Sequence, residues 1–275
     1  MAVGGGPDGR AVATSSPDQV ATPARAAPGG PVRELLRLWG DIEVVGRLGG
    51  GHRNEVLEVR RDGERLVARR SRRSAAALDW ELDLLDFLAG HGFTVPAVVP
   101  APDGRRHVRG VVVQRWLPGR PPGDDDWSRV AGELARLHAL TRDWPQRPGF
   151  RSTAELLHRV RGGDVDLTAM PPTAVAACRR AWRRLADVPR AVVHGDPCPA
   201  NIRVTGHGVG FLDWDESRVD HITLDLADFP VPVLAEPYLT TTRAALDAWE
   251  AANGWSLEPS YARDRLARLT AADGE

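Results

Sequence analysis

The chain has 275 residues, of which 42% are hydrophobic and 27% charged, a balance typical of a globular protein with a sizeable core. Its formal net charge of −1 argues against a general nucleic-acid binder, and no apolar run approaches the ~18 to 20 residues that a membrane span needs. All 36 basic residues are arginine, which excludes a Schiff base or a lysine-containing P-loop. We therefore expect neither a nucleic-acid partner nor a membrane partner.

The N-terminus and the cysteines give two further expectations. The first thirty residues are rich in Gly, Ala and Pro and lack the apolar stretch of a signal peptide, so residues 1–30 are predicted to form a disordered tail. Cys178 and Cys198 are too few for a disulfide framework and have no metal-ligand spacing. This cysteine usage is typical of a reducing compartment, and we expect a cytoplasmic location.

Beyond the tail, the first predicted elements are short strands and one helix. A short amphipathic segment begins at Pro31, and three strands follow between Ile42 and Arg70, the last two joined by an Asp-Gly turn. Leucines at helical spacing predict a helix over residues 75–92, which ends on two glycines. Residues 93–119 return to strands. We therefore predict an N-terminal lobe, residues 31–117, with an antiparallel sheet and a helix.

The composition changes in "PGRPPGDDD", residues 118–126, where Pro, Gly and Asp end the strand pattern, so the boundary between lobes is placed before Pro118. Beyond it, "WSRVAGELARLHALT" and "PTAVAACRRAWRRLADV" carry apolar residues three and four apart and predict helices. The runs "AVVHG" and "VGFLDWD" predict two short strands. The expected fold class is α+β with two lobes, the second of which, residues 118–275, is larger and mainly helical.

Charge is distributed unevenly over these two parts. Residues 31–193 hold 28 Arg and 21 acidic residues, whereas residues 194–275 hold 6 Arg and 14 acidic residues. One interpretation is that the basic part holds a polyphosphate and the acidic part a cationic molecule. The alternative is that surface charge simply varies along the chain.

The stretch "AVVHGDPCPANIRV" carries most of the chemistry. An apolar strand leads into Asp196, and Asn201 follows five residues later, before a second strand; Asp213 ends the next one. If the last two strands pair as a hairpin, two carboxylates and a carboxamide lie together. One carboxylate could then accept a proton from a substrate hydroxyl, while the other and the amide oxygen bind a Mg²⁺ ion carried by a polyphosphate.

The pattern H-x-D-x-x-x-x-N, followed by an aspartate at a strand end, is that of the protein-kinase catalytic loop and metal aspartate. With Gly195 after the histidine and Asp-Trp-Asp in place of Asp-Phe-Gly, residues 192–228 closely resemble the aminoglycoside phosphotransferase family, which has a two-lobed protein-kinase-like fold. The resemblance extends over about residues 40–230. It implies an enzyme that uses ATP and Mg²⁺ to phosphorylate a hydroxyl of a small molecule.

The resemblance also assigns roles. It makes Asp196 the catalytic base, Asn201 and Asp213 the Mg²⁺ ligands, His194 a structural residue of the loop, and Asp225 a buttress of the catalytic region.

Asp215 and His138 each allow an interpretation of their own. Asp215 could support the metal, face the substrate, or be a solvated strand end. His138 lies on an apolar helical face and is interpreted as a core histidine.

The stretch "ERLVARRSRR" allows two interpretations, a nucleic-acid patch or a strand that delivers a guanidinium to phosphate. In kinase-like folds the third strand carries such a cation and a glutamate on the next helix braces it, which "LVAR" and Glu81 fit. Strand alternation sends Arg69 and Arg70 to opposite faces, and the match to the family favours Arg69. Arg72 and Arg73 are expected in a solvated turn.

Two segments would bind the rest of the nucleotide. In "GRLGGGHRNE", Gly49, Gly50 and Gly51 would let backbone N–H groups approach phosphate, although a plain hairpin loop is the alternative. "VVVQRWLPG" resembles the hinge between lobes, where backbone groups from Gln114 to Trp116 would bind adenine; an ordinary edge strand is the alternative.

The acceptor is less well defined than the reaction. The family resemblance points to an aminoglycoside-like antibiotic, and an acidic C-terminal part suits a polycation. The same fold also serves choline-, homoserine- and sugar-directed kinases. A nucleotide-binding pseudokinase is the remaining alternative, but such a protein has no chemical need for Asp196, Asn201 and Asp213 together.

Overall fold

The computed structural model describes residues 30–49 and 54–272. The predicted disordered tail therefore lies outside the described residues, except for Gly30, which begins the first helix. Gly50 and Gly51 also lie outside them. None of the helices in the described ranges is long and apolar enough to cross a membrane.

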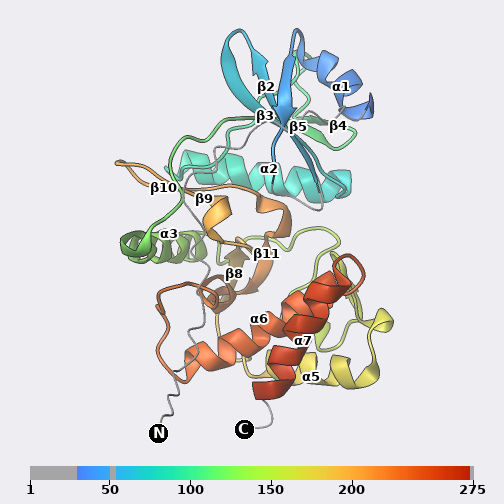
Figure 1. Ribbon diagram of the computed structural model, residues 1–275, viewed down its shortest axis with the longest axis vertical. Helices are drawn as coiled ribbons and strands as arrows, with labels where there is room; N and C mark the ends of the chain where they lie inside the picture. The colour runs from blue at the N-terminus through green and yellow to red at the C-terminus, as the bar shows by residue number, and fades with distance from the viewer. Residues whose placement is uncertain (1–29, 50–53, 273–275) are drawn as a thin grey trace, which may run out of the picture.

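An antiparallel sheet forms the upper part of the molecule (Figure 1). The order of its strands is β1-β2-β3-β5-β4. These strands are β1 (Glu43–Arg47), β2 (Glu55–Arg61), β3 (Glu64–Arg70), β4 (His107–Val108) and β5 (Val111–Arg115). Asp62 and Gly63, between β2 and β3, both have positive φ, as the two central residues of a tight hairpin turn require. Helix α1 (Gly30–Leu36) packs its Val32 and Leu36 into the core of this sheet.

Helix α2 (Ala75–Gly90) lies beneath the sheet (Figure 1). Ser74 caps it by accepting a hydrogen bond from the N–H of Ala77. The leucines that predicted this helix are all buried, and they pack in one cluster with Leu134 of α3 (Trp127–Leu140) and Phe211 of β10 (Val209–Phe211). Helix α2 therefore joins the sheet to the rest of the molecule, whereas the division into lobes at residue 118 stays a prediction.

The remaining chain is mainly helical, as expected, with α5, α6 and α7 at the end opposite the sheet (Figure 1). The helices are α3 (Trp127–Leu140), α4 (Thr153–Leu156), α5 (Pro172–Arg183), α6 (Tyr238–Gly254) and α7 (Pro259–Ala272). A second core cluster forms where α5, α6 and α7 meet, around Trp182 and Trp249. The helical patterns around residues 127–141 and 172–188 are thus borne out by α3 and α5.

Three two-stranded sheets interrupt the helices. They pair β6 (Arg161–Gly162) with β7 (Val165–Asp166), β8 (Arg190–Val193) with β11 (Arg218–His221), and β9 (Ile202–Val204) with β10 (Val209–Phe211). The β9–β10 hairpin is the strand pairing that the sequence required if Asp196, Asn201 and Asp213 were to lie together. The sequence pattern did not predict β11, which holds β8 in place below α2.

Candidate active site

A cleft of about 660 Å³ lies between the sheet and the helical part. It is lined from above by β2, β3 and β5 and from below by the loops around β9 and β10. All described residues to which the sequence assigned a catalytic, metal or nucleotide role line it: Gly49, Arg69, Glu81, Gln114, Trp116, Asp196, Asn201 and Asp213. The fold therefore gathers into one cavity residues that lie up to 164 positions apart in the chain.

Strand alternation explains how the β9–β10 hairpin aims its side chains. Ile202 and Phe211 are fully buried in the core, so their neighbours on each strand point the opposite way. Asn201, Arg203 and Leu212 accordingly line the cleft.

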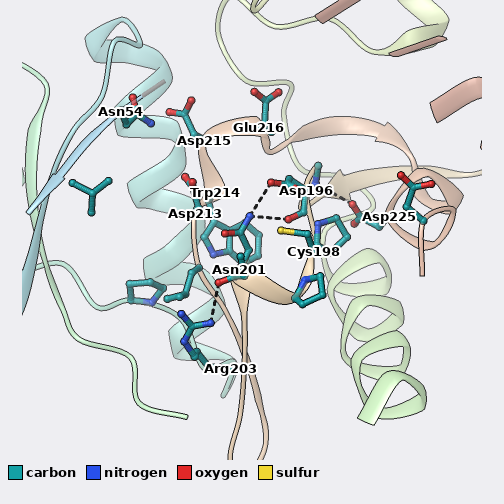
Figure 2. Close-up of a pocket in the computed structure, with 18 of the residues that line it drawn as sticks. Asn54, Asp196, Cys198, Asn201, Arg203, Asp213, Trp214, Asp215, Glu216 and Asp225 are labelled. Carbon is teal, nitrogen blue, oxygen red and sulfur yellow. Dashed lines mark hydrogen bonds between the residues drawn. The ribbon is translucent and has the colours of Figure 1, made fainter. Parts of the chain in front are cut away.

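Asn201 fixes the side chain of Asp196. Its Nδ2 donates to Asp196 Oδ2 over 2.9 Å and to the Asp196 carbonyl over 3.0 Å (Figure 2). This assigns the amide nitrogen to Asp196 and leaves the amide oxygen as the atom of Asn201 that could bind a cation. Asp196 is thus held in one orientation within the cleft.

Asp213 follows β10 and turns the chain into a short 3₁₀ helix, Trp214–Glu216. Its φ of 54° lies in the left-handed region, which is uncommon for a residue other than glycine. Asp213 is exposed at the wall of the cleft, but the groups packed around its carboxyl desolvate it and raise its pKa, although the nearby Arg69 guanidinium opposes this effect. Such a carboxylate is better stabilised with a cation beside it than alone.

His194 and Asp225 support the loop from behind. His194 is fully buried, and its Nε2 donates to the Leu212 carbonyl over 2.8 Å, while Nδ1 accepts a longer bond, 3.3 Å, from the N–H of Asp196. Asp225 accepts hydrogen bonds of 2.9 Å from the N–H groups of His194 and Gly195. The loop that carries Asp196 is therefore bound to the core on two sides.

His138 completes this support. It is 5% exposed, and its Nε2 donates to Asp225 Oδ2 over 2.9 Å. The interpretation as a core histidine fits its position, and the contact explains why a polar ring sits on an apolar helical face.

Arg69 reaches into the cleft from β3. It is 5% exposed and pairs with Glu81 of α2 and, at 3.2 Å, with Asp215. Burial disfavours its charge, but the carboxylates of Glu81 and Asp215 outweigh this and raise the pKa of Arg69. Of Arg69 and Arg70, only Arg69 lines the cleft. Arg69 therefore presents a permanent positive charge to the cleft.

Of the interpretations of Asp215, the solvated strand end is wrong. It is 6% exposed and accepts hydrogen bonds from Arg69, from Nε of Arg73 at 3.1 Å and from the hydroxyl of Ser71. Burial raises its pKa, but the three arginines around it together lower it below the ordinary value. Asp215 thus serves the ion pairs between β3 and the loop after β10.

The expectation of a solvated turn is wrong for Arg73. Its side chain is 10% exposed and also pairs with Asp164 over 2.8 Å, whereas Arg72 is exposed as expected. The turn folds back onto Asp215, which lies 142 residues away and left no local signal in the sequence. Because Arg69 and Arg73 are both committed to buried ion pairs, the run does not form the continuous exposed patch that a nucleic-acid surface needs.

The comparisons with known proteins agree with this architecture. Residues 44–261 match the family model described as the phosphotransferase enzyme family. The chain belongs to this family. It is 34% identical over 137 residues to a homoserine kinase of Cupriavidus metallidurans, over 46% of this chain and 39% of that protein. It is 31% identical to an aminoglycoside 3'-phosphotransferase of Streptomyces ribosidificus, over 59% of this chain and 68% of that protein.

Solved structures of phosphotransferases share the fold. A choline kinase from Streptococcus pneumoniae superposes with a TM-score of 0.63 at 15% identity, over 88% of this chain and 97% of that chain. An amicoumacin kinase gives a TM-score of 0.58 at 17% identity, over 89% and 86%. The family and the α+β protein-kinase-like fold expected from the sequence are confirmed. The chain spans only about two fifths of the length of several of the homoserine kinases that it matches.

The segment expected to bind adenine differs in one detail from the expectation. Gln114 and Trp116 line the cleft, together with Val56 and Val67 from the sheet above. However, the backbone N–H of Trp116 donates to the Arg65 carbonyl at 3.3 Å. This N–H is engaged within the sheet, so the other backbone groups of the segment must supply any contact with the base.

Several cleft residues carried no signal in the sequence. Carboxylates line the end of the cleft that α6 and α7 border, together with one guanidinium: Glu216, Asp228, Glu250, Glu258 and Arg265. Arg147, which lies outside the cleft, is fully buried and donates to Glu81. Arg147, Glu250, Glu258 and Arg265 stand in segments without a motif, whereas Glu216 and Asp228 lie within residues 192–228 but were given no role there. The general acidity of residues 194–275 was the indication of this end.

The support by Asp225 gives a prediction for stability. Burial favours its neutral form, but the bond from His138 and the loop N–H groups outweigh this and lower the pKa of Asp225. Such a carboxyl stabilises the fold above the unfolded-state pKa of about 4, and its contribution is lost as the pH falls through the folded-state pKa. Asp225→Asn should therefore lower the free energy of unfolding by about 3 kcal/mol near neutral pH.

Urea denaturation at a series of pH values checks this. The difference between wild type and Asp225→Asn should be constant at neutral pH and shrink below about pH 4. Asp187→Asn, at an exposed position, is the control and should change little. A difference that stays constant into the acid range would contradict the assigned ionisation of Asp225.

Proposed function

We propose that the protein transfers the γ-phosphoryl group of ATP, with Mg²⁺, to a hydroxyl of a small amine-bearing molecule. The observation that carries the proposal is that Asp196, Asn201, Asp213 and Arg69 line one cleft, with Asp196 oriented by the Asn201 amide. Homoserine kinase and aminoglycoside 3'-phosphotransferase are named among its relatives, which supports a phosphotransferase acting on small molecules.

Asp196 is the base in this proposal. The acceptor hydroxyl forms a bond to the γ-phosphorus, the bond between that phosphorus and the β–γ bridging oxygen breaks, and ADP leaves. The hydroxyl proton passes to the Asp196 carboxylate, which Asn201 holds in place. The protein's contribution is mainly positioning and charge stabilisation.

Asn201 and Asp213 would hold the Mg²⁺ ion. A carboxylate and an amide oxygen are ligands that this cation accepts from proteins, and the raised pKa of Asp213 is consistent with a site that needs a cation. When bound, the ion supplies positive charge at the phosphates. Arg69 adds a second positive charge from the sheet side, held toward the cleft by Glu81 and Asp215.

The acceptor end of the cleft supports an amine. Arg265 is already paired with Asp247 at 2.8 Å and with Asp228 at 2.6 Å. Two carboxylates for one guanidinium leave negative charge in excess, to which Glu250 adds. An ammonium group is therefore favoured here, and a carboxylate on the acceptor would have to compete for Arg265. Choline and aminopropanol kinases, both structural neighbours, are named for acceptors of this kind.

The location remains a proposal as well. Both cysteines of the chain are free, which agrees with a reducing compartment, and ATP is available in the cytoplasm. We propose that the reaction takes place there.

Release of ADP in the presence of MgATP and a panel of acceptors tests the function. The panel contains aminoglycosides, amino alcohols such as choline and aminopropanol, homoserine and neutral sugars. We expect an amine without a carboxylate to stimulate ADP release at least about tenfold, because a charge-assisted contact contributes about 1.5–3 kcal/mol. Nucleotide binding without turnover on any acceptor would favour the pseudokinase instead.

A matched pair of variants tests the acceptor end. Glu250→Gln should raise the KM for the amine acceptor about tenfold and leave the KM for ATP unchanged, since Glu250 lines only the far end of the cleft. Glu133→Gln on α3, outside the cleft, is the control. Equal effects of the two variants on the acceptor KM, or preferential use of a neutral sugar, would overturn the amine assignment.

A further inference from the structure

We infer that Arg147 is a positioning residue that holds the phosphate-facing cation Arg69 and the metal carboxylate Asp213 in a fixed spatial relation. The inference rests on the proposed function of those two residues. Arg147 itself lies in the connection after α3, is fully buried and does not line the cleft. It therefore acts through its neighbours, without contact with nucleotide or acceptor.

Arg147 contacts Glu81 of α2. The two carboxylate oxygens of Glu81 have different partners, since Oε1 accepts from Arg69 and Oε2 accepts from Nη2 of Arg147 over 2.7 Å. Glu81 is fully buried on α2. When Arg69 turns toward phosphate, the contact with Arg147 still holds the Glu81 carboxylate in place.

Arg147 also contacts the backbone that follows Asp213. Nη1 of Arg147 donates to the carbonyl oxygens of Trp214 at 3.1 Å, Asp215 at 3.0 Å and Ser217 at 3.2 Å. These residues immediately follow Asp213 and form the turn that aims it. One guanidinium thus binds the turn after Asp213 and the glutamate that braces Arg69.

A third contact fixes α2 itself. Nε of Arg147 donates to the carbonyl of Ala77 in the first turn of that helix, over 3.0 Å. The guanidinium also lies 4.6 Å from the ring centre of Phe150 and 5.5 Å from that of Trp80. The planar guanidinium thus combines hydrogen bonds from its nitrogens with contacts to two aromatic rings. A lysine ammonium cannot reproduce this, because it offers a point charge without the fork of donors.

The consequence concerns the transition state more than substrate binding. Arg69 and Asp213 belong to opposite sides of the cleft, and stabilisation of the transferring phosphoryl group depends on both being in place together. A misplacement of about 1 Å by a remote substitution can cost about 100-fold in rate. The adenine end of the cleft does not depend on Arg147, so nucleotide affinity should change much less than kcat.

Arg147→Lys tests this, because it keeps a charge for Glu81 but loses most of the carbonyl contacts. The matched control is Arg218→Lys. Arg218 is also buried, pairs with Asp220 over 2.9 Å, stacks on Trp249 and donates to the Glu216 carbonyl over 3.2 Å, but within the described part of the chain Glu81 is not among its partners. We expect Arg147→Lys to lower kcat between about 10- and 100-fold, with the Kd for ADP within about threefold of wild type.

Comparison of the two variants decides between positioning and mere stability. Both should lower Tm to a similar extent, but Arg218→Lys should keep kcat within about twofold of wild type. A parallel loss of Tm and kcat in the two variants, or a wild-type kcat in Arg147→Lys, would overturn the inference.

A failure of the proposed function itself would be recognised separately, as wild-type protein without turnover on any acceptor. In that case the gain in affinity for a non-hydrolysable ATP analogue on adding Mg²⁺ is measured by calorimetry. Arg147→Lys should reduce this gain and Arg218→Lys should not, because of these two arginines only Arg147 contacts both Glu81, which braces Arg69, and the Trp214 and Asp215 carbonyls after Asp213. An equal gain in both variants would overturn the positioning role.

Discussion

Replacing Asp196 with asparagine is expected to lower kcat about 1,000-fold, within the range of about 10²–10⁴ that general-base catalysis contributes. Asparagine has nearly the same shape, and its oxygen can still accept the bond from Asn201 that now reaches Asp196 Oδ2. The loop should therefore keep its conformation while the proton acceptor is lost. ADP release at saturating ATP and acceptor measures kcat, and calorimetry measures the Kd for ADP.

The Kd for ADP should remain within about threefold of wild type, since the base acts on the acceptor hydroxyl. Asp166→Asn is a suitable control, because Asp166 also caps a local turn and pairs with an arginine but lies outside the cleft. Substantial turnover by Asp196→Asn would exclude the base role. A large loss of ADP affinity would instead indicate that Asp196 contributes to metal or nucleotide binding.

Much of the fold could be predicted because its signals are local. The Asp62-Gly63 turn needs positive φ at both residues, and the leucines of α2 need only the helical period. The loop of the proposed base was also accessible, because Asp196, Asn201 and Asp213 occupy a short stretch with fixed spacing, Asp196 in the loop before the β9–β10 hairpin and the other two at its ends. Backbone preferences over a few residues determine all of these features.

Features that depend on distant partners were not accessible. Arg73 and Asp215 are 142 residues apart. The local sequence "ARRSRR" gives no indication that the Arg73 side chain is largely buried while its neighbour Arg72 is exposed. Arg147 is a single arginine in a loop, and its importance comes entirely from the elements that surround it. An ion pair formed by tertiary packing leaves no periodicity in either segment.

The acceptor end was the least predictable part for the same reason. Its residues come from two helices, α6 and α7, and from the segment before them. Glu250 and Arg265 follow no motif, Asp228 only ends the stretch that resembles the family, and the folded arrangement places the three around one space. The acidity of the C-terminal residues indicated the charge of this region but not the paired state of Arg265.

Arg69→Met is expected to have the second large effect, and the charge cluster around Arg69 explains why the variant should still fold. After its removal Glu81 keeps Arg147 at 2.7 Å, and Asp215 keeps Arg73 at 2.8 Å. Neither buried carboxylate is left without a cation, so the usual penalty for an unpaired buried charge is largely avoided. The fold should therefore persist with a reduced Tm.

Arg69→Met should instead weaken nucleotide binding, since Arg69 is the arginine of this cluster that lines the cleft. Without it, ATP affinity should fall about tenfold and kcat about 100-fold, the magnitudes expected for one or two charge-assisted contacts of about 1.5–3 kcal/mol each. The matched control is Arg73→Met, which removes the other guanidinium of Asp215 but lies outside the cleft. Calorimetry with ATP and AMP distinguishes the contributions, because the Arg69 variant should lose more affinity for ATP than for AMP, which has the α-phosphate but lacks the β-phosphate. Equal losses for the two nucleotides, or an equal effect of Arg73→Met, would show that Arg69 supports the fold of the cleft without binding the α- and β-phosphates.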